Sequence, residues 1–402
     1  MQFCARRYDT AEPVRILIEG EQILAVEPVR PTKDVHDWPY VAPGLFDLQI
    51  NGYGGIWFSD ETLTPQKVLT ALAAHYQHGI TRMCPTLITN SFEALHAGFT
   101  AIRTACESEP WADRMVPGCH LEGPYISSED GPRGAHPLEH VRGCDWEEFR
   151  KLQAASGDRI CLVTLAAEAD GACRFIRTAV EHGVTIAIGH TAADSEQIRN
   201  AVDAGARLST HLGNGAHGTI RRHPNYIWDQ LGDSRLTASI ITDGHHLPPS
   251  VVRSFVRAKG LQRIVITCDA SGLAGCKPGV YDYDGGKFEV LEDGPIVIAG
   301  QRQFLAGSGQ QTDVCVANAI AMAGLSLGEA CDLAARAPAR LLGQEVVRLS
   351  RGSRADLMVF DYRGAGSPLQ VLATIASGDV HYGSLEDVTP QAGVSPSLAQ
   401  SA

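Results

Sequence analysis

The chain has 402 residues, of which 44% are hydrophobic and 20% charged, and its formal net charge at pH 7 is −12. These values are typical of a globular protein with enough apolar material for a large core. The negative charge argues against a surface for nucleic acid or anionic membranes, because binding phosphates needs clustered cations. The N-terminal stretch "MQFCARRYDT" has no apolar signal-peptide core, and no apolar run reaches the length of a membrane span. The eleven cysteines include no CxxC pair, which favours reduced thiols and a cytoplasmic location.

Short strands are expected near both chain ends. The stretch "RILIEGEQILAVEPV" (15–29) alternates in polarity around Gly20, a pattern typical of a hairpin. The stretches "GSRADLMVFDYRG" (352–364) and "VLATIASGDVHYG" (371–383) have the same character.

Between these ends, short apolar runs alternate with longer helical patterns, which indicates repeated βα units. The helical patterns include "TPQKVLTALAAHYQHG" (64–79) and "DSEQIRNAVDAG" (194–205), where Asp194 is the expected N-cap. We predict eight strands, a number that matches a (β/α)8 TIM-like barrel. An open, doubly wound sheet is the alternative, but no GxGxxG motif follows the first strand. The predicted strands cover residues 45–50, 81–88, 115–121, 159–165, 184–189, 206–210, 236–242 and 263–269.

Polar residues stand at the ends of four of these strands, and a barrel gathers its strand ends at one mouth. Glu122 follows the third strand, His190 the fifth and His211 the sixth, while Asp269 closes the eighth. A carboxylate and two imidazoles make a three-ligand set with an open fourth position, as in a catalytic zinc site. Asp269 would serve as the general base and acid. A single histidine at a strand end is more often structural, and an aspartate after a strand is often a helix cap. The joint position of all four residues at one mouth nevertheless favours a metal site.

The ordered motifs in the chain resemble those of the N-acetylglucosamine-6-phosphate deacetylase family of the amidohydrolase superfamily. They are "PGLFDLQINGYGG", "HLEGPYIS…GAHP", "GHT", "THLGNG", "DGHHLPP", "CDA" and "LAGS", and the resemblance runs from about residue 40 to 360. It implies a metal-dependent barrel with a small flanking β-sandwich built from both chain ends. The corresponding domains are 1–42 plus 345–388 for the β-sandwich and 43–344 for the barrel; the tail 389–402 has no periodicity and is expected to be disordered.

The resemblance also assigns roles to residues. It implies that Glu122, His190 and His211 bind the metal and that Asp269 is catalytic. His246 would orient the carbonyl group of the substrate, with the adjacent His245 as the competitor for that role. Substrate contacts would come from His136, Asn214 and the backbone at Gly215.

Two departures from related sequences affect the expected site. Many superfamily members carry HxH after the first strand and a bridging lysine on the fourth, but here the first strand ends in Gln49-Ile50-Asn51 and the fourth offers no lysine. We therefore expect one divalent ion per subunit, Zn²⁺ or Fe²⁺. Gln49 and Asn51 would either orient the ligands and water or be structural.

The second departure lies in "NGAHGTIRRHPNYIWDQL" (214–231), where the family's usual asparagine-alanine-methionine run is replaced. Arg221 and Arg222 stand near the place of the family's phosphate-binding arginine, which reaches the neighbouring subunit's site. The resemblance thus implies a homodimer and an amino sugar phosphate as the small-molecule partner.

The sequence accordingly predicts hydrolysis of the N-acetyl group of N-acetylglucosamine 6-phosphate, giving glucosamine 6-phosphate and acetate. One alternative is a related amidohydrolase that acts on another N-acyl amino sugar or on an N-acyl amino acid. A non-enzymatic barrel scaffold is the second, and the intact set of Glu122, His190, His211 and Asp269 argues against it. Segment 267–286 is expected to form a loop and hairpin over the barrel mouth.

Overall fold

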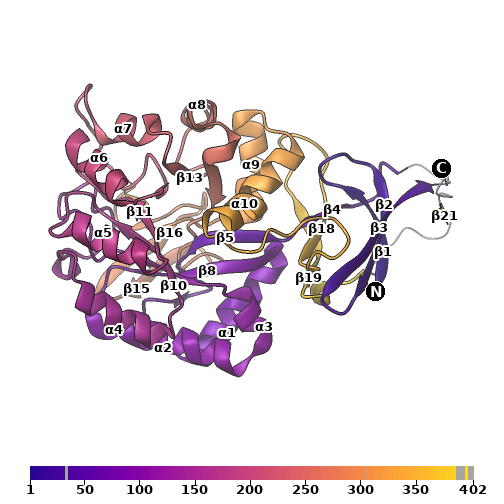
Figure 1. The fold of residues 1–402 in the computed structure, drawn as a ribbon, viewed down its shortest axis with the longest axis horizontal. Helices are drawn as coiled ribbons and strands as arrows, with labels where there is room; N and C mark the ends of the chain where they lie inside the picture. Colours follow the sequence, from indigo (N-terminus) through magenta and orange to yellow (C-terminus); the bar gives the residue numbers. More distant parts are fainter. Residues whose placement is uncertain (32–34, 303, 386–393, 397–402) are drawn as a thin grey trace.

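The computed structural model of the chain describes residues 1–31, 35–302, 304–385 and 394–396. Figure 1 shows a helix-lined barrel beside a smaller sheet that both ends of the chain build. No helix in these described ranges has the length and apolar character needed to cross a membrane. Apolar side chains of the barrel and of the smaller sheet join in one buried cluster, which includes Phe3 and Ile16 from the sheet and Phe46 from the barrel.

The barrel contains, within the described residues, eight parallel strands, and all eight predicted runs contribute one. A parallel bridge between Ile50 and Ala270 closes it, and the Asn51 backbone N–H donates to the Ala270 carbonyl at 2.8 Å. The predicted (β/α)8 fold is thereby confirmed. The strands are β5 (Leu45–Ile50), β8 (Ile80–Ile88), β9 (Cys119–Glu122), β10 (Ile160–Leu165), β11 (Thr185–Ile188), β12 (Leu208–Ser209), β13 (Thr237–Ile241) and β14 (Ile264–Thr267).

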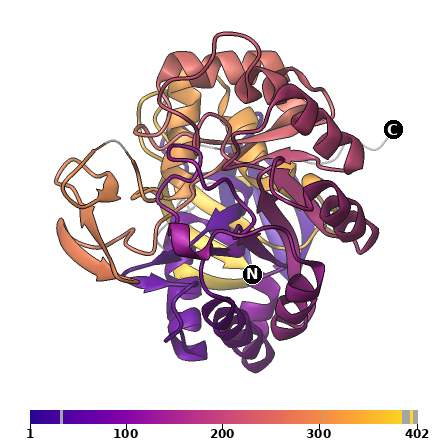
Figure 2. The ribbon, with the colours of Figure 1, turned by 90° about the vertical axis from the view of Figure 1, so that its left-hand side faces the viewer.

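Figure 2 shows the helices arranged in a ring around these strands. Local signals in the sequence explain their ends: the Asp194 side chain accepts from the backbone of α6 and forms a capping box with Gln197, as its position predicts. The helices are α1 (Pro65–Ala74), α2 (Phe92–Ser108), α3 (Pro110–Met115), α4 (Trp146–Ser156), α5 (Ala172–Glu181), α6 (Ser195–Ala204), α7 (Tyr226–Gly232), α8 (Pro249–Lys259), α9 (Thr312–Ala323) and α10 (Leu327–Leu341), with 3-10 turns η1 (His75–His78), η2 (Leu138–His140) and η3 (Leu261–Arg263).

The third barrel strand is shorter than the predicted segment 115–121. Met115 ends helix α3, and the strand begins only at Cys119. Pro117 lies between them and has no N–H to give to a strand ladder, so it separates the helix from the strand.

The flanking sheet joins the first forty residues to the last strands of the chain, as expected. Its order is β20-β19-β18-β4-β1-β2-β3-β21, and its pairs are antiparallel except for β1 with β4. The strands are β1 (Gln2–Arg7), β2 (Pro13–Glu19), β3 (Gln22–Pro31), β4 (Tyr40–Pro43), β18 (Leu357–Asp361), β19 (Gln370–Ala376), β20 (Asp379–Gly383) and β21 (Val394–Pro396). The division at residues 42/43 and 344/345 stays a prediction.

The predicted disordered tail, 389–402, falls mostly outside the described residues. Within it, Val394–Pro396 forms β21, which pairs antiparallel with β3.

A three-stranded antiparallel sheet borders the barrel mouth, where the sequence predicts a covering loop and hairpin. It consists of β15 (Gly279–Tyr283), β16 (Gly286–Val290) and β17 (Ile296–Ile298), and Figure 2 shows it projecting from one side of the barrel. The indole of Trp57, in the small hairpin β6 (Gly52–Tyr53)–β7 (Ile56–Trp57), stacks on Tyr283 with ring centroids 4.4 Å apart. This stacking anchors the three-stranded sheet to the rim of the barrel mouth.

One buried histidine makes stability depend on pH. Burial, together with the nearby His78, lowers the pKa of His75 from 6.5 to about 3. Between these values the unfolded chain binds a proton here that the folded chain does not, so stability is lost as pH falls below 6.5. The loss is about 1.36 kcal/mol per pH unit.

When the pH falls from about 6.5 to 5.0, the free energy of unfolding of the wild type should therefore decrease by about 2 kcal/mol more than that of His75→Gln. Urea unfolding at the two pH values measures the difference. The exposed His96 supplies the control, since His96→Gln should follow the wild type. Parallel pH slopes for all three proteins would rule out a proton-linked role of His75.

Candidate metal centre and catalytic site

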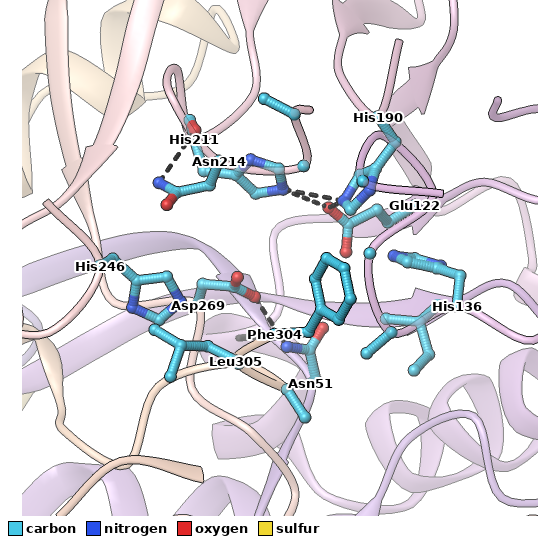
Figure 3. Close-up of a pocket in the computed structure, with 18 of the residues that line it drawn as sticks. Asn51, Glu122, His136, His190, His211, Asn214, His246, Asp269, Phe304 and Leu305 are labelled. Atoms are coloured by element: carbon cyan, nitrogen blue, oxygen red, sulfur yellow. Dashed lines mark hydrogen bonds and ion pairs between the residues drawn. The ribbon is translucent and has the colours of Figure 1, made fainter. Parts of the chain in front are cut away.

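The side chains predicted at the barrel mouth project from neighbouring strand ends (Figure 3). Glu122 is the last residue of β9, while His190, His211 and Asp269 are each the second residue after their strands, β11, β12 and β14. The last three have φ angles of 49°, 29° and 53°, respectively. Residues other than glycine rarely adopt this left-handed region, and they persist in it where the surrounding structure holds them. The backbone is thus strained at three of the four predicted positions.

Three of these side chains bring potential ligand atoms together. Nε2 of His211 lies 3.0 Å from Oε1 of Glu122 and 3.0 Å from Nε2 of His190, and the latter is 3.3 Å from the same Oε1. Ligand atoms about 2.0–2.2 Å from one tetrahedral zinc ion stand about 3.3–3.5 Å apart. The triangle therefore has nearly the size that a single ion requires.

The surroundings of the imidazoles and of the carboxylate also suit metal ligands. Nδ1 of His190 lies 2.8 Å from the Pro132 carbonyl oxygen and so carries the hydrogen, which leaves a lone pair on Nε2. Burial lowers the pKa of His211. Burial alone would raise the pKa of Glu122, but its hydrogen bonds with His190 and His211 lower it well below its usual value. This pair of imidazoles with an ionised carboxylate fits a divalent cation.

A third imidazole lies beside this set. The possible ligand atoms of Glu122, His136 and His190 all lie within 4.8 Å of one another. The His136 ring packs against His190 with centroids 4.3 Å apart, and its Nδ1 is 2.8 Å from Oγ1 of Thr89. Burial and the proximity of His190 lower the pKa of His136 to about 3, so this imidazole is neutral.

Gln49 and Asn51 each hold one of the acidic side chains. Nε2 of Gln49 donates to Oε1 of Glu122 at 2.8 Å, and Nδ2 of Asn51 donates to Oδ1 of Asp269 at 2.8 Å. Burial raises the pKa of Asp269 well above its usual value, and the negative charge of Glu122 adds to this. A cation bound beside Glu122 would act in the opposite direction.

His246 lies on the opposite side of the mouth, near Asp269 (Figure 3). Its Nδ1 is 2.8 Å from Oδ2 of Asp243, which also accepts from Oγ of Ser308 at 2.9 Å. The sequence analysis assigns no role to Asp243 or Ser308, although both fall within quoted motifs, "DGHHLPP" and "LAGS". Their connection joins residues 65 positions apart, and so only the fold reveals it.

The site opens into a cavity of about 430 Å³. Asn214 and Gly215 border it, as do both His245 and His246. Gly215 has φ +54°, and a Cβ there would come 2.8 Å from Nδ1 of His190, so this position requires glycine. Other described residues on its wall include Asn51, Trp57, Glu122, His136, His190, His211, His217, Asp269, Phe288, Arg302 and Phe304.

The two predicted phosphate-binding arginines lie elsewhere. Arg221 and Arg222 are exposed, and neither is among the described residues that border the cavity of their own chain. Arg302, which the sequence analysis does not single out, does border it and pairs with Asp293 at 3.0 Å.

The fold and the site together define a class: a (β/α)8 enzyme whose strand ends carry a Glu/His/His cluster able to hold a metal ion. Residues 40–381 match the Amidohydrolase family, and the chain belongs to this family.

Several proteins resemble the chain over most of its length. The N-acetylgalactosamine-6-phosphate deacetylase of Escherichia coli O157:H7 is 33% identical over 84% of this chain and 88% of its own length. The N-acetylglucosamine-6-phosphate deacetylase of Homo sapiens is 34% identical over 85% of this chain and 83% of its own. Among solved structures, the N-acetyl-D-glucosamine-6-phosphate deacetylase of Mycobacterium smegmatis aligns with a TM-score of 0.84 and 31% identity, covering 94% of this chain and 99% of its own. A mutant of that enzyme has been solved in complex with N-acetyl-D-glucosamine-6-phosphate.

Proposed function

We propose that this amidohydrolase hydrolyses the N-acetyl group of N-acetylglucosamine 6-phosphate to glucosamine 6-phosphate and acetate. The observation that carries the proposal is the triangle of Glu122, His190 and His211, with sides of 3.0–3.3 Å, facing Asp269 across one cavity. The alignments with two relatives named N-acetylglucosamine-6-phosphate deacetylase cover 85% of this chain and 83% of each relative. The likeness therefore extends well beyond the site.

Glu122, His190 and His211 would hold one divalent ion per subunit, Zn²⁺ or Fe²⁺. When bound, such an ion supplies the Lewis acidity that makes water nucleophilic near neutral pH. The absence of lysine from residues 162–168, at the end of the fourth strand, supports one ion rather than a bridged pair. Gln49, through its bond to Glu122, would keep that carboxylate oriented.

The remaining residues would handle the proton and the substrate. Water adds to the amide carbon, Asp269 accepts a proton from it, and the same proton passes to the nitrogen as the C–N bond breaks. Asn51 would hold Asp269 in place, and His246 would donate a hydrogen bond to the carbonyl oxygen as it becomes negative. His136, Asn214 and Gly215 would contact the substrate from the cavity wall.

The enzyme would be a cytoplasmic homodimer. Arginines of one subunit would bind the phosphate group of the substrate held in the other subunit. The exposed Arg221 and Arg222 support this arrangement, because neither borders the described cavity of its own chain and both are free of a described ion pair. Ile220, next to Arg221 in the chain, and Trp228 on the following helix α7 are 37% and 56% exposed and supply apolar surface for such a contact. Guanidinium groups bind phosphate through paired hydrogen bonds.

A substrate panel with an arginine variant tests the need for phosphate. We expect the R221A/R222A double variant to raise KM for N-acetylglucosamine 6-phosphate at least about tenfold, since charge-assisted hydrogen bonds contribute about 1.5–3 kcal/mol. Turnover of unphosphorylated N-acetylglucosamine should not change. The matched control is the exposed Arg257, whose alanine variant should behave as the wild type.

The 6-phosphate epimer N-acetylgalactosamine 6-phosphate is the second candidate substrate, since the relative from Escherichia coli O157:H7 carries that name. A kcat/KM higher for the galactosamine derivative would favour it. Equal rates with and without phosphate would instead favour another N-acyl amino sugar or an N-acyl amino acid.

A further inference from the structure

The cavity at the barrel mouth has two chemically different halves. The described residues that border it after β11, β12 and β13 are mainly polar, among them His190, His211, Asn214, His217 and His246. The half on the side of β5, β8 and the three-stranded sheet is mostly apolar, and the reaction described above gives it no role. Its apolar wall consists of the side chains of Trp57, Ile88, Phe288, Phe304, Leu305 and Ala306.

The polar side chains beside the apolar wall already have partners. Nδ2 of Asn51 donates to Oδ1 of Asp269 at 2.8 Å, and Nδ1 of His136 lies 2.8 Å from Oγ1 of Thr89. Arg302 pairs with an aspartate at 3.0 Å. This half of the cavity therefore has few free polar atoms for the hydroxyl groups of a sugar, which find more partners in the polar half.

Backbone pairing holds the apolar wall close to Asp269. The Ala306 N–H donates to the Ile296 carbonyl at 2.9 Å, so the chain at this point extends the three-stranded sheet. Two residues further, the Ser308 N–H donates to the Asp269 carbonyl at 2.7 Å. The wall thus begins within a few residues of the group that would move the proton.

Trp57 contributes apolar surface but no free ring face. The residue is only 4% exposed, because Tyr283 stacks on its indole with ring centroids 4.4 Å apart and the backbone of Gly272 packs against it. A Cβ at Gly272 would lie 2.3 Å from the indole ring. A sugar ring therefore has no open aromatic face to stack on here, and the indole serves as an apolar border.

The shape of an amide directs its two ends to different halves of the cavity. An amide is planar, and in the trans form its two carbon substituents lie at opposite ends. When the carbonyl carbon lies between the metal triangle and Asp269, the sugar on the nitrogen and the alkyl group extend in opposite directions. The sugar phosphate needs the polar half, so the alkyl group points toward the apolar wall. Figure 3 shows Phe304 and Leu305 on the side of Asn51, with Asn214 on the other side.

We infer that the apolar wall receives the acyl group of the substrate and that the enzyme hydrolyses amino sugar phosphates whose acyl chains are longer than acetyl, such as propionyl and butyryl. This inference rests on the proposed deacetylation. A methyl group contacts only part of the wall, and each further methylene group buries more apolar surface against it. Water cleaves the same C–N bond, and the products are the amino sugar phosphate and propionate or butyrate in place of acetate.

A series of N-acyl glucosamine 6-phosphates tests the inference on the full-length, metal-loaded enzyme. We expect kcat/KM to rise from the acetyl to the propionyl and butyryl substrates, by up to about fourfold for each methylene group. The rise should come from a lower KM, since the alkyl chain makes the same contacts in the ground state and the transition state. Values of kcat/KM below that of the acetyl substrate for both longer chains would overturn the inference.

Replacement of Phe304 by alanine tests where the acyl chain lies. The butyryl chain loses more contact than the acetyl group, so the ratio of their kcat/KM values should fall about fourfold. Phe92 supplies the matched control: it is partly buried at the start of α2 and is not among the described residues that border the cavity. Phe92→Ala should keep the wild-type ratio. An unchanged ratio in Phe304→Ala would contradict the placement, and Leu305→Ala tests the same wall if Phe304→Ala fails to fold.

The substrate series also separates the inference from the proposed function. Hydrolysis of the acetyl substrate alone would leave the proposed deacetylation standing and refute the inference. Hydrolysis of no member of the series would refute both.

Discussion

Replacement of Asp269 by asparagine is expected to lower kcat by a factor of about 10²–10⁴ while metal remains bound. Asparagine has nearly the same shape and can still accept from Nδ2 of Asn51, which lies 2.8 Å from Oδ1 in the wild type. It cannot take a proton from water or return one to the leaving nitrogen. Steady-state kinetics and metal analysis on the same preparation measure the two properties together.

An exposed aspartate provides a matched control for this change. Asp282 lies on β15 and is exposed, so Asp282→Asn should retain wild-type kcat and metal content. Turnover of Asp269→Asn within a few-fold of the wild type would show that another group moves the proton. Loss of metal together with activity would instead make Asp269 a ligand.

The positions of the predicted site residues follow from two simple patterns in the sequence. Apolar runs that alternate with helical periods predict a barrel, and parallel strands place their carboxyl ends on one face. Glu122, His190 and His211 could therefore be grouped before any distance was known, although they are 68 and 21 residues apart in sequence, respectively. The strand boundaries are predicted less accurately. The sixth strand is predicted over residues 206–210, for example, but β12 consists only of Leu208 and Ser209.

The supporting contacts could not be predicted, since they depend on non-local geometry. Nothing in the sequence indicates that the Pro132 carbonyl accepts from Nδ1 of His190, or that Ser308 reaches Asp243. The left-handed backbone at His190 and His211 is equally hidden, because histidine shows no local preference strong enough to signal it. The partner of each polar group is chosen by packing of distant segments.

The roles of Gln49 and Asn51 could be predicted only in part. Their place at the end of the first strand suggests a role in orienting ligands, but the sequence could not pair Gln49 with Glu122 and Asn51 with Asp269. The alternation of side chains explains the result, since residues two apart on a strand point to the same face. Both amides thus reach into the barrel mouth, and each meets the nearest carboxylate.

Glu122 is expected to control how tightly the metal binds, because it is the one carboxylate in the triangle with His190 and His211. Its amide replacement, Glu122→Gln, removes the negative charge while keeping the size of the side chain. Gln49→Ala removes only the hydrogen bond that holds Glu122, and loss of such supporting contacts usually weakens metal binding about 10–100-fold.

We therefore expect a graded loss of metal affinity, with Gln49→Ala weakened about 10–100-fold and Glu122→Gln weakened further. Equilibrium dialysis of each full-length variant against buffered Zn²⁺ and Fe²⁺ measures this, and activity at saturating metal should recover for Gln49→Ala but not for Glu122→Gln. Glu139→Gln, at an exposed carboxylate, should bind metal as the wild type does. If Glu122→Gln holds metal as tightly as Glu139→Gln, the ion is bound by other residues, and His136 beside His190 becomes the first alternative ligand.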